Sequence, residues 1–192
     1  DLHSFPTRRS SDLAMGLTIQ LIFVTVRYAG EIIGLQMGLS FATFYDPSGG
    51  ENMPVVSRIL NLLGILLFLL FNGHLLMLNA LAESFQLLPI SAAPLSRDAF
   101  IALPQTAGLV FQCGVGLGLP VITLLLAINL TLGLLNRLTP QLSIFVVGFP
   151  LTLVVGMLAL LLLMNHLAPY FYHLIALFFE RLSQILLLFR TG

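Results

Sequence analysis

The sequence predicts an all-α integral membrane protein, and three observations support this fold class. Charged residues make up only 8% of the chain and hydrophobic residues 58%, whereas a soluble domain carries about 25% charged residues. Three stretches, 59–82, 99–136 and 138–179, contain no charge, and a helix needs about 20 apolar residues to cross a bilayer. Apolar residues come in blocks and do not alternate, so the pattern does not fit a membrane β-barrel.

The first residues of the chain differ in character from the rest of it. The peptide SFPTRRSSDL at 4–13 looks like a translated sequencing adaptor. Arg8 and Arg9 could be mistaken for a twin-arginine signal, but such a signal needs a short apolar region and a small-residue cleavage site, and here the apolar pattern simply continues. We therefore expect residues 1–13 to be a non-native artefact and leave them out of the topology.

A first helix is expected over 14–44, with a break near Gly38. Gly30, Gly34 and Gly38 recur every four residues and so share one helix face. A stripe of small residues lets a second helix approach closely, which predicts helix packing along this face.

A polar, turn-rich insert follows at 44–54, between two apolar stretches. Pro47 and Pro54 lack backbone donors, and Gly49-Gly50 accepts backbone angles that other residues avoid. The chain therefore cannot cross the membrane here as a plain helix. Two interpretations remain open, an ordinary loop between membrane helices and a segment placed inside a protein-lined pore.

The remaining helices follow from the apolar runs. A second helix is expected over 55–84, with its apolar run interrupted at 72–74, and a connection rich in proline and serine spans 87–97. The next helix covers 99–119, and alternating glycines before Pro120 predict a break between helices there.

A helical hairpin is expected over 120–164, with its turn at 137–140. Pro150 should kink the second arm because an interior proline removes a helix hydrogen bond. A last amphipathic helix is expected over 172–190. Arg137 at the tip favours the cytoplasmic side by the positive-inside rule.

The chain shows no pattern of an enzyme or of a cofactor site. Paired carboxylates, a Ser/His/Asp set, HExxH, CxxC and a P-loop are all missing from the sequence. His166 and His173 lack a third ligand for a metal site. Net charge is zero, which gives no electrostatic footprint for nucleic acid. A scaffold or conduit, in which backbone shape matters more than acidity, is the favoured class.

Several ordered motifs resemble one family over the chain from about Leu13 to its C-terminus. They read GLQMGLSFATF at 34–44, DP at 46–47, NMPV at 52–55, FNGHL at 71–75, LLPI at 87–90, LPVI at 119–122, LGLLNR at 132–137 and PQLSIFVVGFPLT at 140–152. This set resembles the FliR family of flagellar export-gate proteins, the inner-membrane R proteins of type III secretion.

The resemblance implies a structural subunit of the flagellar export gate in the bacterial inner membrane and flagellar basal body. It implies FliP, FliQ, FlhB and FlhA as partners, and unfolded flagellar proteins as the exported substrates. Residues 14–98 would be FliP-like, and 99–192 FliQ-like with the hairpin 120–164. The family also implies a helical region upstream of Met15, so we expect this chain to be truncated at its N-terminus.

The resemblance also assigns roles to two groups of residues. The insert would be the loop that plugs the closed gate, with the residues Phe44, Asp46, Pro47, Gly49, Gly50, Met53 and Pro54. Helix packing and the hairpin would depend on Gly30, Gly34, Gly38, Gly133, Arg137, Pro140, Gly148 and Pro150. The alternatives are a virulence-type secretion homologue and a small-molecule membrane transporter.

Overall fold

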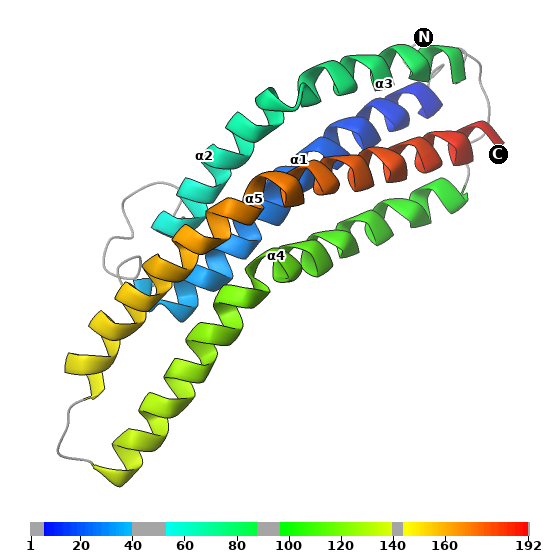
Figure 1. Ribbon diagram of the computed structural model, residues 1–192. Coiled ribbons are helices and arrows are strands. Elements are labelled where there is room, and N and C mark those ends of the chain that lie inside the picture. Colours follow the sequence, from blue (N-terminus) through cyan, green and yellow to red (C-terminus); the bar gives the residue numbers. More distant parts are fainter. Residues whose placement is uncertain (1–5, 40–52, 88–96, 140–143, 192) are drawn as a thin grey trace, which may run out of the picture. The chain divides into compact units, whose positions relative to one another are not determined.

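The computed structural model describes residues 6–39, 53–87, 97–139 and 144–191, and every regular element in these ranges is an α-helix. Figure 1 shows them coloured along the sequence. In chain order they are α1 (Pro6–Gln36), α2 (Val55–Leu70), α3 (Gly73–Leu87), α4 (Arg97–Leu138) and α5 (Ile144–Thr191). The predicted all-α class is confirmed for the described part of the chain.

Three of the described helices are long and apolar enough to cross a membrane. Their apolar segments are 12–36 in α1, 104–138 in α4 and 146–188 in α5. Helices α2 and α3 pass the same test only as a pair, and they bend by 63° at the break between them. This pair is either a fourth, broken span or a re-entrant loop, and the prediction of membrane helices is confirmed.

The prediction of one helix over 55–84 is wrong, because the chain bends at Phe71-Asn72. Asn72 has a φ of 56°, in the left-handed region. Its N–H donates to the carbonyl of Leu69 at 3.1 Å, which tightens the last turn of α2. Asparagine visits this region more readily than most residues because its short polar side chain can bond locally. The interruption at 72–74 therefore ends one helix and begins the next.

Two predicted helix breaks are also wrong. α4 runs without interruption through the glycines and proline at 114–120. α5 is one helix of 48 residues that contains both Pro150 and Pro169, where separate helices over 141–164 and 172–190 were expected. Away from water, an unwound segment would leave its backbone polar groups unsatisfied, so a helix that loses one bond at proline still persists. The hairpin turn itself is confirmed, since α4 ends at Leu138 and α5 begins at Ile144.

The chain divides into two compact units, and every described helix except α3 contributes to both. Unit 1 consists of residues 1–25, 64–113 and 171–192. Its core joins the start of α1 to the end of α5 through Ala14, Met15, Leu182, Ile185 and Leu186. Two edge-to-face aromatic pairs also lie within unit 1, Phe23–Phe68 at 5.3 Å and Phe71–Tyr172 at 5.4 Å between ring centroids.

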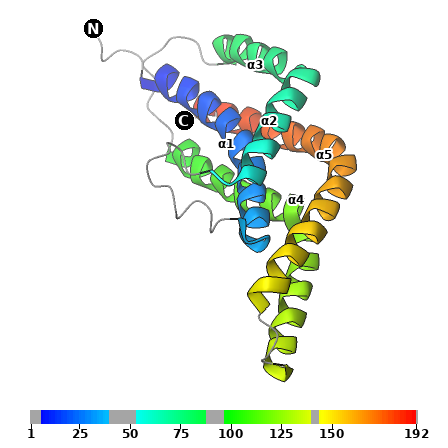
Figure 2. The same ribbon diagram turned by 90° about the vertical axis from the view of Figure 1, so that its left-hand side faces the viewer.

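Unit 2 consists of residues 26–63 and 114–170. It contains the end of α1, the start of α2, and the hairpin formed by the second half of α4 and the first half of α5. These two hairpin arms lie side by side in both views (Figures 1 and 2). Side chains from α1, α2 and both arms are fully buried or nearly so within the unit, including Ile33, Met37, Leu60, Leu125 and Leu163.

Candidate functional site

The polar insert, residues 44–54, lies in the sequence between α1 and α2. Residues 40–52 lie outside the described ranges, and so do five of the predicted plug residues, Phe44, Asp46, Pro47, Gly49 and Gly50. Met53 and Pro54 are described, and both are half-buried. The carbonyl of Pro54 accepts a hydrogen bond from the N–H of Arg58 at 3.0 Å, so Pro54 leads directly into α2. The site is therefore described from Met53 and Pro54 and from the end of α1.

The glycine stripe of α1 lies where other elements of unit 2 come closest. A Cβ added at Gly30 would lie 2.5 Å from the Cα of Ser57 in α2, so only glycine fits against that backbone. A Cβ at Gly34 would lie 3.1 Å from the Cβ of Pro54, at the returning end of the insert. Gly38 has a φ of +78° and faces the Phe149 ring of α5. Gly30 and Gly34 thus face the same stretch, 54–57, whereas Gly38, just beyond the end of α1, faces α5.

A hydrogen bond reinforces the crossing of α1 and α2. The Oγ of Ser57 donates to the backbone carbonyl of Arg27 at 2.8 Å, and Ser57 is fully buried. A buried hydroxyl without a partner would be costly, so this bond satisfies Ser57 while it joins the two helices. Sequence reasoning missed Ser57, although a small polar residue early in the helix that follows a glycine stripe is a candidate for close packing against that stripe.

A second polar contact holds the last residue of α1. The Nδ2 of Asn129, in α4, lies 3.3 Å from both the backbone carbonyl oxygen and the side-chain Oε1 of Gln36. The last four carbonyls of a helix have no partner inside that helix. Asn129 therefore supplies from the hairpin a donor that α1 lacks at its end. Sequence reasoning also missed this residue, although it is a carboxamide inside a long uncharged run.

The residue after Gln36 is enclosed by the other arm of the hairpin. Met37 is 1% exposed. A Cβ added at Gly156 of α5 would lie 2.7 Å from the Cγ of Met37. The backbone N–H of Met37 bonds to the carbonyl of Ile33 at 2.9 Å, so Met37 continues the hydrogen-bonding pattern of α1 just beyond Gln36. Both arms of the hairpin thus contact the end of α1.

The other predicted hairpin residues occupy varied positions. No described atom lies within 4 Å of a Cβ built at Gly133, whereas one built at Gly148 would lie 3.4 Å from Leu132 on the opposite arm. Arg137 is exposed in the last turn of α4, where a cation complements the helix dipole. Pro150 is exposed within α5, and Pro140 lies outside the described ranges.

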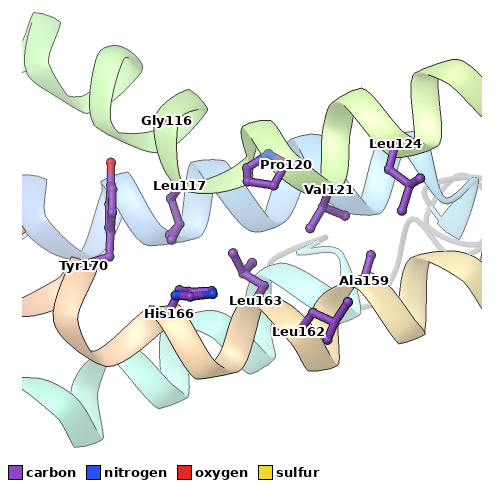
Figure 3. Close-up of a pocket in the computed structure, with 10 residues that line it drawn as sticks. All are labelled: Gly116, Leu117, Pro120, Val121, Leu124, Ala159, Leu162, Leu163, His166 and Tyr170. Atoms are coloured by element: carbon purple, nitrogen blue, oxygen red, sulfur yellow. The ribbon is translucent and has the colours of Figure 1, made fainter.

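A groove of about 410 Å³ lies between the two hairpin arms (Figure 3). Leu117 and Val121 of α4 point towards Leu163 and His166 of α5, and Tyr170 stands against Gly116 at one end. The full lining is Gly116, Leu117, Pro120, Val121, Leu124, Ala159, Leu162, Leu163, His166 and Tyr170. This groove is apolar apart from the imidazole and the phenol, so its lining offers packing and no set of groups for acid–base catalysis.

A smaller hollow of about 160 Å³ lies in unit 1, between the start of α4 and the end of α5. Its polar lining includes Gln105, Thr106, Arg181 and Gln184, and the Nη1 of Arg181 donates to Gln184 at 3.0 Å. Thr106 donates to the carbonyl of Ala102 in its own helix. Among the described residues there is no group of three His, Cys, Asp or Glu side chains that could hold a metal ion.

Comparison with known proteins gives a consistent result. The family described as bacterial export proteins, family 1, matches residues 12–178. A flagellar biosynthetic protein FliR from Pectobacterium carotovorum subsp. carotovorum is 58% identical over 91% of this chain and 67% of its own length. The protein of the same name from Escherichia coli K12 is 55% identical over the same shares. One from Caulobacter vibrioides is 34% identical over 81% of this chain and 62% of its own length.

This chain therefore spans about two thirds of the length of the relatives it matches. The family match begins at residue 12, and the proposed artefact at 1–13 stays a prediction. All the motifs that carried the resemblance lie inside the matched residues, as do the glycine stripe, the hairpin and the groove. The chain belongs to the bacterial export proteins, family 1.

Proposed function

We propose that this protein is a structural subunit of the flagellar type III export gate. With FliP and FliQ it would form the channel that carries unfolded flagellar proteins across the bacterial inner membrane, in an apparatus completed by FlhB and FlhA. Family membership and the flagellar names of its relatives support this role.

One structural observation carries the proposal: the hairpin has a large, exposed apolar surface. Both arms expose bulky aliphatic side chains by half or more of their area, among them Leu130, Leu134, Leu138, Val146, Val154, Leu161 and Leu162. A surface of this extent must meet lipid or other proteins. The exposed glycine Gly133 within it suits close approach of another helix. An assembling subunit of a membrane channel presents such a surface.

The same proposal assigns different roles to the two parts of the chain. Residues 14–98 would correspond to the FliP-like part and 99–192 to the FliQ-like part. The exposed Arg137 at the hairpin turn would lie on the cytoplasmic side, in keeping with the positive-inside rule.

We further propose that the insert 44–54 plugs the closed gate. The described residues on either side support this role, because Gly38, which precedes the insert, lies against α5, and Pro54, its last residue, lies against α1. The sequence between them carries glycines and prolines rather than a helical pattern. Asp46 and Glu51 would then be solvated residues of the lumen. Movement of the segment, and no covalent chemistry, would open the path.

Deleting residues 48–53 from the full-length protein tests the plug. We expect the assembled gate to become leaky to small ions, because the seal is removed while the helices that hold its ends remain. Membrane ion permeability in cells with the deletion, compared with cells that carry the unaltered gate, is the measurement. Unchanged permeability in cells that assemble the gate normally would contradict the plug.

A further inference from the structure

We infer that Asn129 is a positioning residue, which holds the end of α1 against the α4–α5 hairpin. The inference deepens the proposed gate function and rests on it for its consequence, a tight closed state. Its structural part stands on contacts within unit 2 alone.

The position of Asn129 is costly for a carboxamide side chain. Asn129 lies in the apolar segment 104–138 of α4 and is half-buried. An amide removed from water costs free energy unless it finds a partner. Its Nδ2 finds two acceptors on one residue, the carbonyl oxygen and the Oε1 of Gln36, each at 3.3 Å. The donor group of Asn129 is thus satisfied by α1 and not by its own helix.

Both acceptor atoms belong to the residue at the C-terminal end of α1. Gln36 is the last residue of α1, so its carbonyl is one of those that the helix leaves unpaired. Beyond it the N–H of Gly38 bonds to the carbonyl of Leu35 at 3.1 Å, and Gly38 turns into the left-handed region. Asn129 therefore caps α1 from another helix, at the residue where the helical path ends.

Helix α5 also packs against the end of α1. Met37 packs onto Gly156, and Gly38 faces Phe149. A hydrogen bond to α4 and two packing contacts to α5 together restrict both rotation and sliding of the end of α1. A displacement of the hairpin relative to α1 would break the two hydrogen bonds first, because at 3.3 Å they are already long.

A reversible crosslink measures this arrangement without reference to export. In the full-length protein with Cys113→Ser, a Met37→Cys and Gly156→Cys pair places one sulfur close to where the Met37 Cγ lies. A disulfide forms only when the Cβ atoms approach to about 4 Å. We expect efficient crosslinking in the membrane. Adding Asn129→Leu should lower the crosslinking rate about threefold, since two long interhelical hydrogen bonds, each of 3.3 Å, are lost.

Two further variants separate positioning from a general loss of folding. Asn129→Gln keeps the carboxamide donor and should recover most of the crosslinking rate. Asn79→Leu makes the same chemical change at an exposed site on α3 and should leave the rate unchanged. Equal crosslinking in Asn129→Leu and in the unaltered background would overturn the inference. An equal loss in Asn79→Leu would overturn it as well.

Ion permeability then tests the consequence, in proteins without the introduced cysteines. Asn129→Leu should raise the leak through the assembled gate, towards the level reached when residues 48–53 are deleted. If the deletion leaks and Asn129→Leu does not, the positioning role in gate closure is refuted. If the deletion itself does not leak, the plug assignment fails, and the crosslinking result alone decides whether Asn129 holds α1.

Discussion

At the scale of single residues, glycines of the same helix differ sharply in what surrounds them. Gly30 meets the backbone of α2, and backbone atoms cannot move aside as a flexible side chain can. Gly16, also in α1, has no described atom within 4 Å of an added Cβ. The same substitution at these two positions therefore separates the cost of lost space from the gain in helix propensity.

Gly30→Ala should destabilise the protein by about 1–3 kcal/mol, the usual cost of overpacking. Gly16→Ala should be neutral or stabilising by up to about 1 kcal/mol, because alanine favours a helix over glycine. Unfolding of the purified protein in detergent, followed by circular dichroism against denaturant, measures both. Similar stability of the two variants would show that α1 and α2 do not approach as closely as the structure has them.

At the scale of elements, the break between α2 and α3 depends on one backbone conformation. The left-handed Asn72 ends α2, and Leu75 and Leu76 donate their N–H groups back to its carbonyl to begin α3. The next residue, Gly73, lies against the Phe68 ring, which leaves no space for a side chain unless the ring moves. Local geometry and packing therefore favour the bend together.

Asn72→Gly should preserve both the bend and the stability, because glycine adopts left-handed angles without strain. Asn72→Val should lose about 1–2 kcal/mol, since a β-branched residue is disfavoured there. The same substitution at the exposed, helical Asn79 provides the control and should change stability little. Detergent unfolding curves of the three variants test this. No loss in Asn72→Val would mean that the left-handed turn is not needed.

At the scale of the whole molecule, the hairpin presents many exposed aliphatic side chains that the described residues do not cover. A Cβ added at Gly133 would meet no described side chain and no other described helix within 4 Å. If the proposed function holds, its role lies in assembly, where a small residue lets a neighbouring helix approach. Folding and assembly can therefore be separated at this position.

Gly133→Leu in the full-length protein should leave the stability of the isolated subunit unchanged. Its co-purification with FliP and FliQ should fall about tenfold, equivalent to ~1.4 kcal/mol. Gly108→Leu is a matched control, since it lies in the same helix and also has no described atom within 4 Å. A similar fall in both variants, or normal co-purification of Gly133→Leu, would contradict a specific role for Gly133.

Much of the fold could be predicted from composition and turn chemistry. The apolar runs predicted the helices and the membrane setting, and the residues at 137–140 predicted the hairpin turn. The errors all concerned where helices break. Asn72 broke a helix that was expected to continue, while the glycines and proline at 114–120 and Pro169 did not interrupt theirs. Local helix propensity does not include the cost of leaving backbone groups unpaired away from water, and this cost favours a continuous helix even where proline removes one hydrogen bond.

By itself, the sequence determined the class of the molecule and the family to which it belongs. Hydrophobicity and motif order are properties of the chain alone and do not depend on how its helices meet. Only the tertiary structure decided which residues hold α1 against α2 and against the hairpin. Ser57, Asn129 and Gly156 act through contacts with residues distant in sequence, at Arg27, Gln36 and Met37. Such pairings depend on how helices cross, which no local pattern in the chain encodes.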